Sequence, residues 1–127
     1  MSAYMIICHF YSPEEAFEPF KQKSFVPFRD AGDEPSDFEC SLFDCLKGLD
    51  KAISYNWYNY RTFDYKEYEN MHRLDNGDMN WIIPGKILAL SSPTAARKDG
   101  LPPDHFVEPF LDMGIKCIIK LNESLYS

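Results

Sequence analysis

The stretch at residues 74–86 (LDNGDMNWIIPGK) constrains the fold more than any other part of this chain. Asn76 and Gly77 predict a tight turn, because both residues tolerate positive φ angles. Residues 81–83 then predict a short buried strand, and Pro84 with Gly85 turns the chain again. We therefore expect this stretch to be a joint between two structural units, with its carboxylates facing outward.

The segments before this stretch predict one strand and several helices. Residues 4–8 form a continuous apolar run, which is typical of a strand covered on both faces. Capping residues or apolar residues at helical spacing predict helices over residues 12–20, 41–54 and 64–73. Residues 21–39 are expected to form a long loop, because Pro27, Gly32 and Pro35 disfavour helices and strands there.

The segments after this stretch predict an α/β arrangement. We expect a strand at residues 87–90, a helix at 104–113 that Gly114 ends, and a strand at 115–121. The continuous apolar character of the last strand favours a parallel sheet with helices on both faces. Such a unit is too small to cover itself. We therefore expect either that it docks onto the first unit or, as we favour, that the chain is a piece of something longer.

Composition and charge limit the kinds of partner. The chain has 127 residues, of which 45% are hydrophobic, so it can build a core. Its net charge of −7 argues against a nucleic-acid partner and suits basic peptides or proteins. No apolar run approaches the ~20 residues of a membrane span, so no membrane partner is predicted. The N-terminus lacks the features of a signal peptide, which favours a reducing compartment and free, mostly buried thiols at Cys8, Cys40, Cys45 and Cys117.

Motifs for metals, cofactors and covalent catalysis are missing from the sequence. The three histidines lie on different segments without ligand spacing, and no glycine-rich phosphate loop is found, so we predict neither metal nor cofactor. Phosphatases of the tyrosine type need an arginine six residues after the nucleophilic cysteine. The residues at that spacing after the four cysteines are Glu14, Leu46, Lys51 and Glu123. We therefore predict no catalytic residue in this chain.

A set of acidic residues is the most suggestive functional feature. Its members are Asp30, Glu67, Glu69, Asp75 and Asp78. One interpretation is a groove for a positively charged peptide segment. The other is a solvated helix face and loop, and spacing alone leaves both open.

Residues 75–86 (DNGDMNWIIPGK) resemble the "ENGD-NWI-PGK" segment of the cell-division-cycle-fourteen family of dual-specificity protein phosphatases. The segments SPEEA, VPFRDA, DCLKGL, TFDYKEYE and KLN also resemble family segments, in the same order along the chain. The resemblance is therefore collinear over nearly the whole sequence.

The resemblance implies a fold and a domain layout. The family has two tandem phosphatase-like α/β domains, joined by a linker helix, and only the second carries the nucleophile. By this resemblance, residues 1–63 would be most of the non-catalytic N-terminal domain and residues 64–78 the linker helix and turn. Residues 79–127 would be the start of an incomplete catalytic domain, with the family's cysteine–arginine phosphate loop lying beyond residue 127.

The resemblance also implies a substrate class. The family prefers phosphoserine followed by proline, with a basic residue shortly after that an acidic groove recognises. By motif position, Asp30, Glu69 and Asp78 correspond to groove carboxylates. His72 stands where the family usually has a further glutamate, which reduces the inferred negative potential, and Asp75 would compensate.

Two functional hypotheses follow. In the first, the chain is the N-terminal segment of such a phosphatase, acts in cell-cycle control in the nucleus and cytoplasm, and is inactive alone. Its partners would be phosphoproteins with basic residues near phosphoserine-proline. In the alternative, it is a stand-alone, non-catalytic acidic module that binds basic phosphoproteins or a partner subunit.

Overall fold

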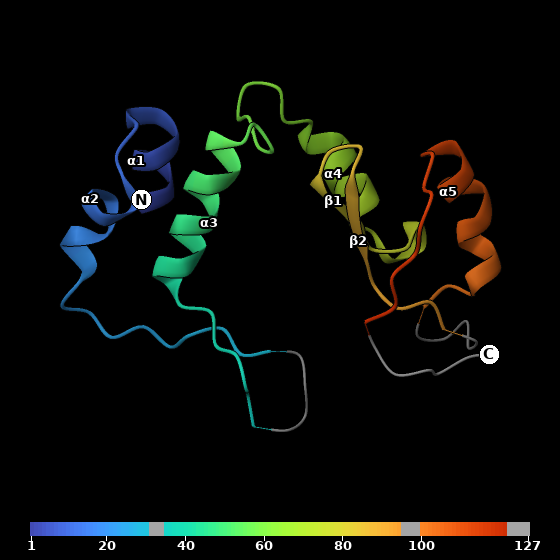
Figure 1. The fold of residues 1–127 in the computed structure, drawn as a ribbon, viewed down its shortest axis with the longest axis horizontal. Coiled ribbons are helices and arrows are strands. Elements are labelled where there is room, and N and C mark those ends of the chain that lie inside the picture. Colours follow the sequence, from blue (N-terminus) through green and yellow to red (C-terminus); the bar gives the residue numbers. More distant parts are fainter. Residues whose placement is uncertain (31–34, 95–99, 122–127) are drawn as a thin grey trace. The chain divides into compact units, whose positions relative to one another are not determined.

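The computed structural model describes residues 1–30, 35–94 and 100–121, which fall into two compact units, Met1–Phe63 and Asp64–Ser127 (Figure 1). The first unit contains the helices α1 (Ser2–His9), α2 (Pro13–Phe17) and α3 (Leu42–Ser54), with a 3-10 turn, η1 (Glu18–Phe20). The second contains the helices α4 (Tyr65–Met71) and α5 (Val107–Asp112), the 3-10 turns η2 (Leu74–Asn76) and η3 (Pro103–Phe106), and the strands β1 (Met79–Ile83) and β2 (Ile87–Leu90).

Three helices enclose a small core in the first unit. Ile6 of α1, Ala16 of α2 and Leu46 of α3 are buried against one another. Phe17 packs beside this cluster, and its ring centroid lies 5.3 Å from that of Phe43. Because few side chains of these helices are buried, the stability of this unit depends on few contacts.

Capping residues set the starts of two of these helices, and the cap at Ser12 was predicted. The Ser12 side chain accepts from the Glu15 amide, and the Glu15 carboxylate accepts from the Ser12 amide. Ser41 and Asp44 form the same reciprocal pair at the start of α3. Each pair satisfies two backbone donors that a helix end would otherwise leave unbonded.

The strand predicted at residues 4–8 is wrong, because this segment lies within the helix α1. A short apolar run has no periodicity that distinguishes a strand from a buried helix. Here the run packs as a helix, and Ile6 is its most buried residue. The only β-bridge described in this unit joins Phe28 and Cys40, where the backbone N–H of each residue donates to the carbonyl of the other.

A hairpin forms the sheet of the second unit, and it confirms the strands and the Pro84-Gly85 turn. Strands β1 and β2 pair antiparallel, with Met79 opposite Leu90 and Ile83 opposite Ile87. The amide of Lys86 donates to the carbonyl of Ile83 at 2.9 Å and closes the turn. The strand β1 is only partly buried, since 56% of Ile82 is exposed.

Gly77 lets the chain turn into this hairpin. Its φ of 97° is the left-handed conformation expected for the Asn76-Gly77 turn. A Cβ atom at this position would lie 2.3 Å from Cε1 of Phe106, which is itself buried. Gly77 is therefore needed both for the backbone conformation and for the close approach of the aromatic ring.

The parallel sheet and the strand predicted at residues 115–121 are wrong for the part of the chain that the structure describes. The sheet found there is the two-stranded antiparallel hairpin, and residues 115–121 are irregular. A parallel pair needs a crossover of a dozen or more residues, whereas the short Pro84–Lys86 connection joins antiparallel neighbours. Ile118 and Ile119 are 70% and 77% exposed and pair with no described strand.

The helix predicted at residues 104–113 is confirmed as η3 followed by α5, and Gly114 ends it with a φ of 68°. The mixture of helices and a small sheet is consistent with the α/β class in its broad sense. Among the described residues, no helix is both long and apolar enough to cross a bilayer.

Candidate substrate-binding surface

Asp30 belongs to the loop that the Phe28–Cys40 bridge closes in the first unit. Its Oδ2 accepts a hydrogen bond from the amide of Asp37 at 3.2 Å. Its own amide donates to Ser36 Oγ at 3.3 Å, and that hydroxyl donates to the carbonyl of Phe38. The carboxylate is thus oriented by its own loop.

Glu69 lies on α4, which begins at the capping residue Asp64. The hydroxyl of Tyr65, one turn earlier, donates to Glu69 Oε1. This hydrogen bond is the main reason that the pKa of Tyr65 is raised. Tyr65 therefore holds one carboxylate oxygen of Glu69 in position, and a hydroxyl group brings no positive charge that would offset the carboxylate.

His72 and Asp78 form the closest contact between predicted groove positions. The imidazole Nδ1 lies 3.0 Å from Asp78 Oδ1, and 3.4 Å from Nδ2 of Asn80. The ring also stacks on Tyr68, with centroids 5.9 Å apart and planes 12° apart. The imidazole therefore contacts one of the two oxygens of the Asp78 carboxylate.

The backbone holds Asp78 in an uncommon conformation. Its φ is 47°, in the left-handed region that non-glycine residues rarely adopt. Its amide donates to the carbonyl of Arg73 at 3.1 Å, and its carbonyl accepts from the amide of Ser91 at the same distance. These two bonds tie Asp78 to the end of α4 and to the residue after β2.

Asp75 is a highly exposed candidate carboxylate. Its side chain is 85% exposed, and its Oδ2 lies 3.4 Å from Nη2 of Arg73. This exposed pair contributes little to stability, because water screens the two charges. Arg73 still reduces the negative potential that Asp75 was expected to supply.

A surface depression of about 370 Å³ lies beside these groups and is lined by Glu69, His72 and Arg73. The structure thus brings Glu69 and the His72–Asp78 pair to one surface of the second unit, with Asp75 held by Arg73. Asp30 belongs to the first unit. Sequence reasoning missed the contributions of Tyr65 and Arg73. The Tyr65–Glu69 spacing of one helical turn was the signal that could have revealed the first.

The cysteines are less buried than predicted. Cys8, Cys45 and Cys117 are exposed and Cys40 is half-buried, and all four thiols are free. The prediction was wrong because lying in or beside an apolar segment does not by itself bury a cysteine. Cys8 and Cys117 fall in the runs 4–8 and 115–121, which are not sheet strands. In the described residues, no cluster of three or more histidine, cysteine or acidic side chains could hold a metal ion.

Comparison with known proteins identifies the relatives of this chain. Residues 1–52 match the family described as the dual specificity protein phosphatase, N-terminal half. The chain is 37% identical over 134 residues to dual specificity protein phosphatase CDC14AB of Danio rerio, an alignment that covers 99% of this chain. It is 34% identical to CDC14A of Homo sapiens and 36% identical to tyrosine-protein phosphatase cdc-14 of Caenorhabditis elegans, again over 99% of this chain.

By sequence, the chain is similar over nearly its whole length to the N-terminal portion of the CDC14-family dual-specificity phosphatases. The match to these relatives extends past the 1–52 segment and includes the surface around Glu69 and Asp78. The chain spans about a fifth of the length of the CDC14 proteins it matches, with 22%, 23% and 19% of the three covered.

Proposed function

We propose that this chain supplies a substrate-binding surface of a dual-specificity protein phosphatase and has no catalytic chemistry of its own. The observation that carries the proposal is the match of 99% of the chain to CDC14 phosphatases. The spacing of the cysteines agrees with it, since none is followed by an arginine six residues later. The whole phosphatase would provide the thiolate that attacks phosphorus and the acid that protonates the leaving oxygen.

The surface is proposed to recognise a basic residue near phosphoserine-proline. Residues 64–80 contain five carboxylates against two lysine or arginine side chains. Glu69 and Asp78 would receive the basic side chain, Asp75 would add long-range attraction, and Asp30 would contribute from the first unit. Charged surfaces of this kind act mainly on association rate and specificity.

The domain layout and cellular role are part of the same proposal. Residues 1–63 would belong to a non-catalytic phosphatase-like domain, 64–78 to a linker helix and turn, and 79–127 to the start of a catalytic phosphatase-like domain. The division of the structure between Phe63 and Asp64 supports a boundary there. By its relationship to CDC14, the protein would act in cell-cycle control in the nucleus and cytoplasm.

Peptide binding tests the proposed surface. A fluorescent phosphoserine-proline peptide with a lysine shortly after the proline should bind more tightly than the same peptide with alanine there. Glu69→Gln and Asp78→Asn should each weaken binding of the lysine peptide by roughly two- to fivefold, as expected for exposed charge pairs. Asp112→Asn, the same charge change at an exposed position of α5 in the same unit, is the matched control. Equal affinity for both peptides would refute the proposed surface.

A turnover assay tests the absence of catalysis. The chain should release no phosphate from a generic aryl phosphate above the buffer rate, and turnover would contradict the proposal.

A further inference from the structure

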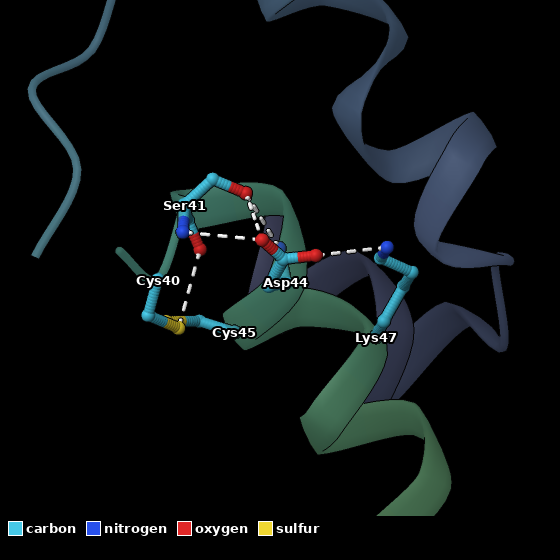
Figure 2. Close-up of polar contacts among 5 residues, drawn as sticks. All are labelled: Cys40, Ser41, Asp44, Cys45 and Lys47. Atoms are coloured by element: carbon cyan, nitrogen blue, oxygen red, sulfur yellow. Dashed lines mark hydrogen bonds and ion pairs between the residues drawn. The ribbon is translucent and has the colours of Figure 1, made fainter. Parts of the chain in front are cut away.

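Two cysteines lie within reach of each other at the start of α3. The sulfur atoms of Cys40 and Cys45 are 3.7 Å apart, with one thiol hydrogen-bonded to the other (Figure 2). In the described part of the chain, neither Cys8 nor Cys117 has such a sulfur neighbour. A disulfide needs a sulfur–sulfur distance of about 2.05 Å, so the two atoms must approach by about 1.7 Å.

The local backbone permits this approach. Cys45 belongs to the first turn of α3, whereas Cys40 precedes the capping residue Ser41 and lies outside the helix. Two cysteines at this spacing inside one helix would point to different faces. Because Cys40 is not helical, its side chain turns back toward Cys45, as Figure 2 shows.

We propose that Cys40 and Cys45 form a reversible disulfide when the protein meets hydrogen peroxide, making this pair a redox-modification site. The Cys45 sulfur first attacks peroxide. A sulfur–oxygen bond forms, the oxygen–oxygen bond breaks, and the released hydroxide takes the thiol proton and leaves as water. The Cys40 sulfur then attacks the sulfenic acid, the sulfur–sulfur bond forms, and the hydroxide leaves with the Cys40 proton as a second water.

The surroundings of the two thiols indicate which reacts first. Cys45 is exposed, whereas Cys40 is half-buried and also donates weakly to the carbonyl of Ser41 at 3.8 Å. The hydrogen bond with Cys45 and burial raise the pKa of Cys40. Cys40 therefore keeps its proton longer and is suited to be the resolving thiol.

The disulfide would change how one loop is held. The backbone of Cys40 makes both hydrogen bonds of the Phe28 bridge, and Asp30 lies two residues beyond Phe28. Cys45 precedes the buried Leu46. Oxidation therefore links the closing bridge of the Asp30 loop covalently to the helix that supports the core.

Peptide mass spectrometry tests the disulfide directly. No lysine or arginine lies between residues 30 and 47, so trypsin releases both cysteines in one peptide. The full chain carrying Cys8→Ser and Cys117→Ser is treated with peroxide at low protein concentration, alkylated and digested. We expect this peptide to lose two hydrogens and to take no alkyl group. After reduction of the disulfide, the same peptide should take two alkyl groups. Retention of two alkylatable thiols, or oxidation to sulfinic acid without a crosslink, would overturn the proposal.

Two further measurements separate native geometry from chance proximity in the chain. The disulfide should form at least several-fold faster in buffer than in concentrated urea, and equal rates would contradict a folded site. In Cys40→Ser, a sulfenic-acid trap should label Cys45 strongly, whereas in Cys45→Ser the label on Cys40 should be weaker. Neither result depends on peptide binding, so this test and that of the proposed function can fail separately.

Discussion

His72 Nδ1 lies 3.0 Å from Oδ1 of Asp78, within the candidate surface. The two residues are exposed to different degrees, 61% for the His72 side chain and 31% for that of Asp78. A histidine at this position supplies no negative charge, whereas a glutamate would.

Replacing His72 by glutamate should therefore strengthen binding of a lysine-containing peptide. The substitution removes the partner of Asp78 and adds a carboxylate beside Glu69. We expect a gain of roughly two- to fivefold at low salt, which should shrink at high salt because the charges are exposed. Fluorescence anisotropy measures the affinity, and His72→Gln serves as the control that removes the imidazole without adding an anion. A salt-independent gain would show that the effect is not electrostatic.

Gly77→Ala should destabilise the second unit more than Gly85→Ala. Both glycines have positive φ angles, so alanine costs about 1–2 kcal/mol of backbone strain at either site. Only at Gly77 does the added methyl meet a ring, and such overpacking costs typically about 1–3 kcal/mol more. Urea denaturation followed by tryptophan fluorescence compares the two variants. Equal destabilisation would mean that the Phe106 ring moves aside freely, and adding Phe106→Leu to Gly77→Ala tests this.

Leu46→Ala should destabilise the first unit by about 2–4 kcal/mol, because it opens a cavity in a core of very few buried residues. Leu42→Ala, on the same helix but 36% exposed, should cost much less. Thermal unfolding monitored by circular dichroism provides the comparison. If both variants unfold at the same temperature, Leu46 is not a core residue.

Acid should weaken α3 through Asp44. Its pKa is lowered from 3.8 to about 2, first by Lys47 and then by Ser41. Because the folded-state pKa lies below the ordinary value, this stabilisation is present above about pH 4 and is lost as the pH falls toward 2. Helicity measured from about pH 5 to about pH 2 should fall less steeply for Asp44→Asn. Asp50→Asn in the same helix is the control and should keep the wild-type slope over this range.

Local signals in the sequence predicted the features that depend on local chemistry. The Ser12 cap, the Asn76-Gly77 turn and the Gly114 helix end each follow from the residues at those positions. Residues 4–8 and 115–121 were wrongly predicted to be strands, because an apolar run indicates only that burial is favourable. Whether such a run becomes a helix, a strand or neither depends on the segments it meets.

The candidate surface was predictable only in part for the same reason. The acidic residues of α4 share a helix, so their spacing is visible in the sequence. The contact between His72 and Asp78 depends instead on the path through η2 and the left-handed pair at Gly77 and Asp78. The spacing of apolar residues in the sequence does not predict this backbone path. The sequence also did not predict that Arg73 would offset the negative charge of Asp75.

The position of Asp78 between a left-handed glycine and the buried Met79 has an evolutionary consequence. Asp78 directly precedes strand β1 of the hairpin, whereas its neighbour His72 lies at the C-terminal end of α4. Exchanges at the helix end can therefore raise or lower the preference for cationic targets in single steps. The scaffold would not have to be rebuilt each time, so related proteins can diverge in target choice while keeping the same architecture.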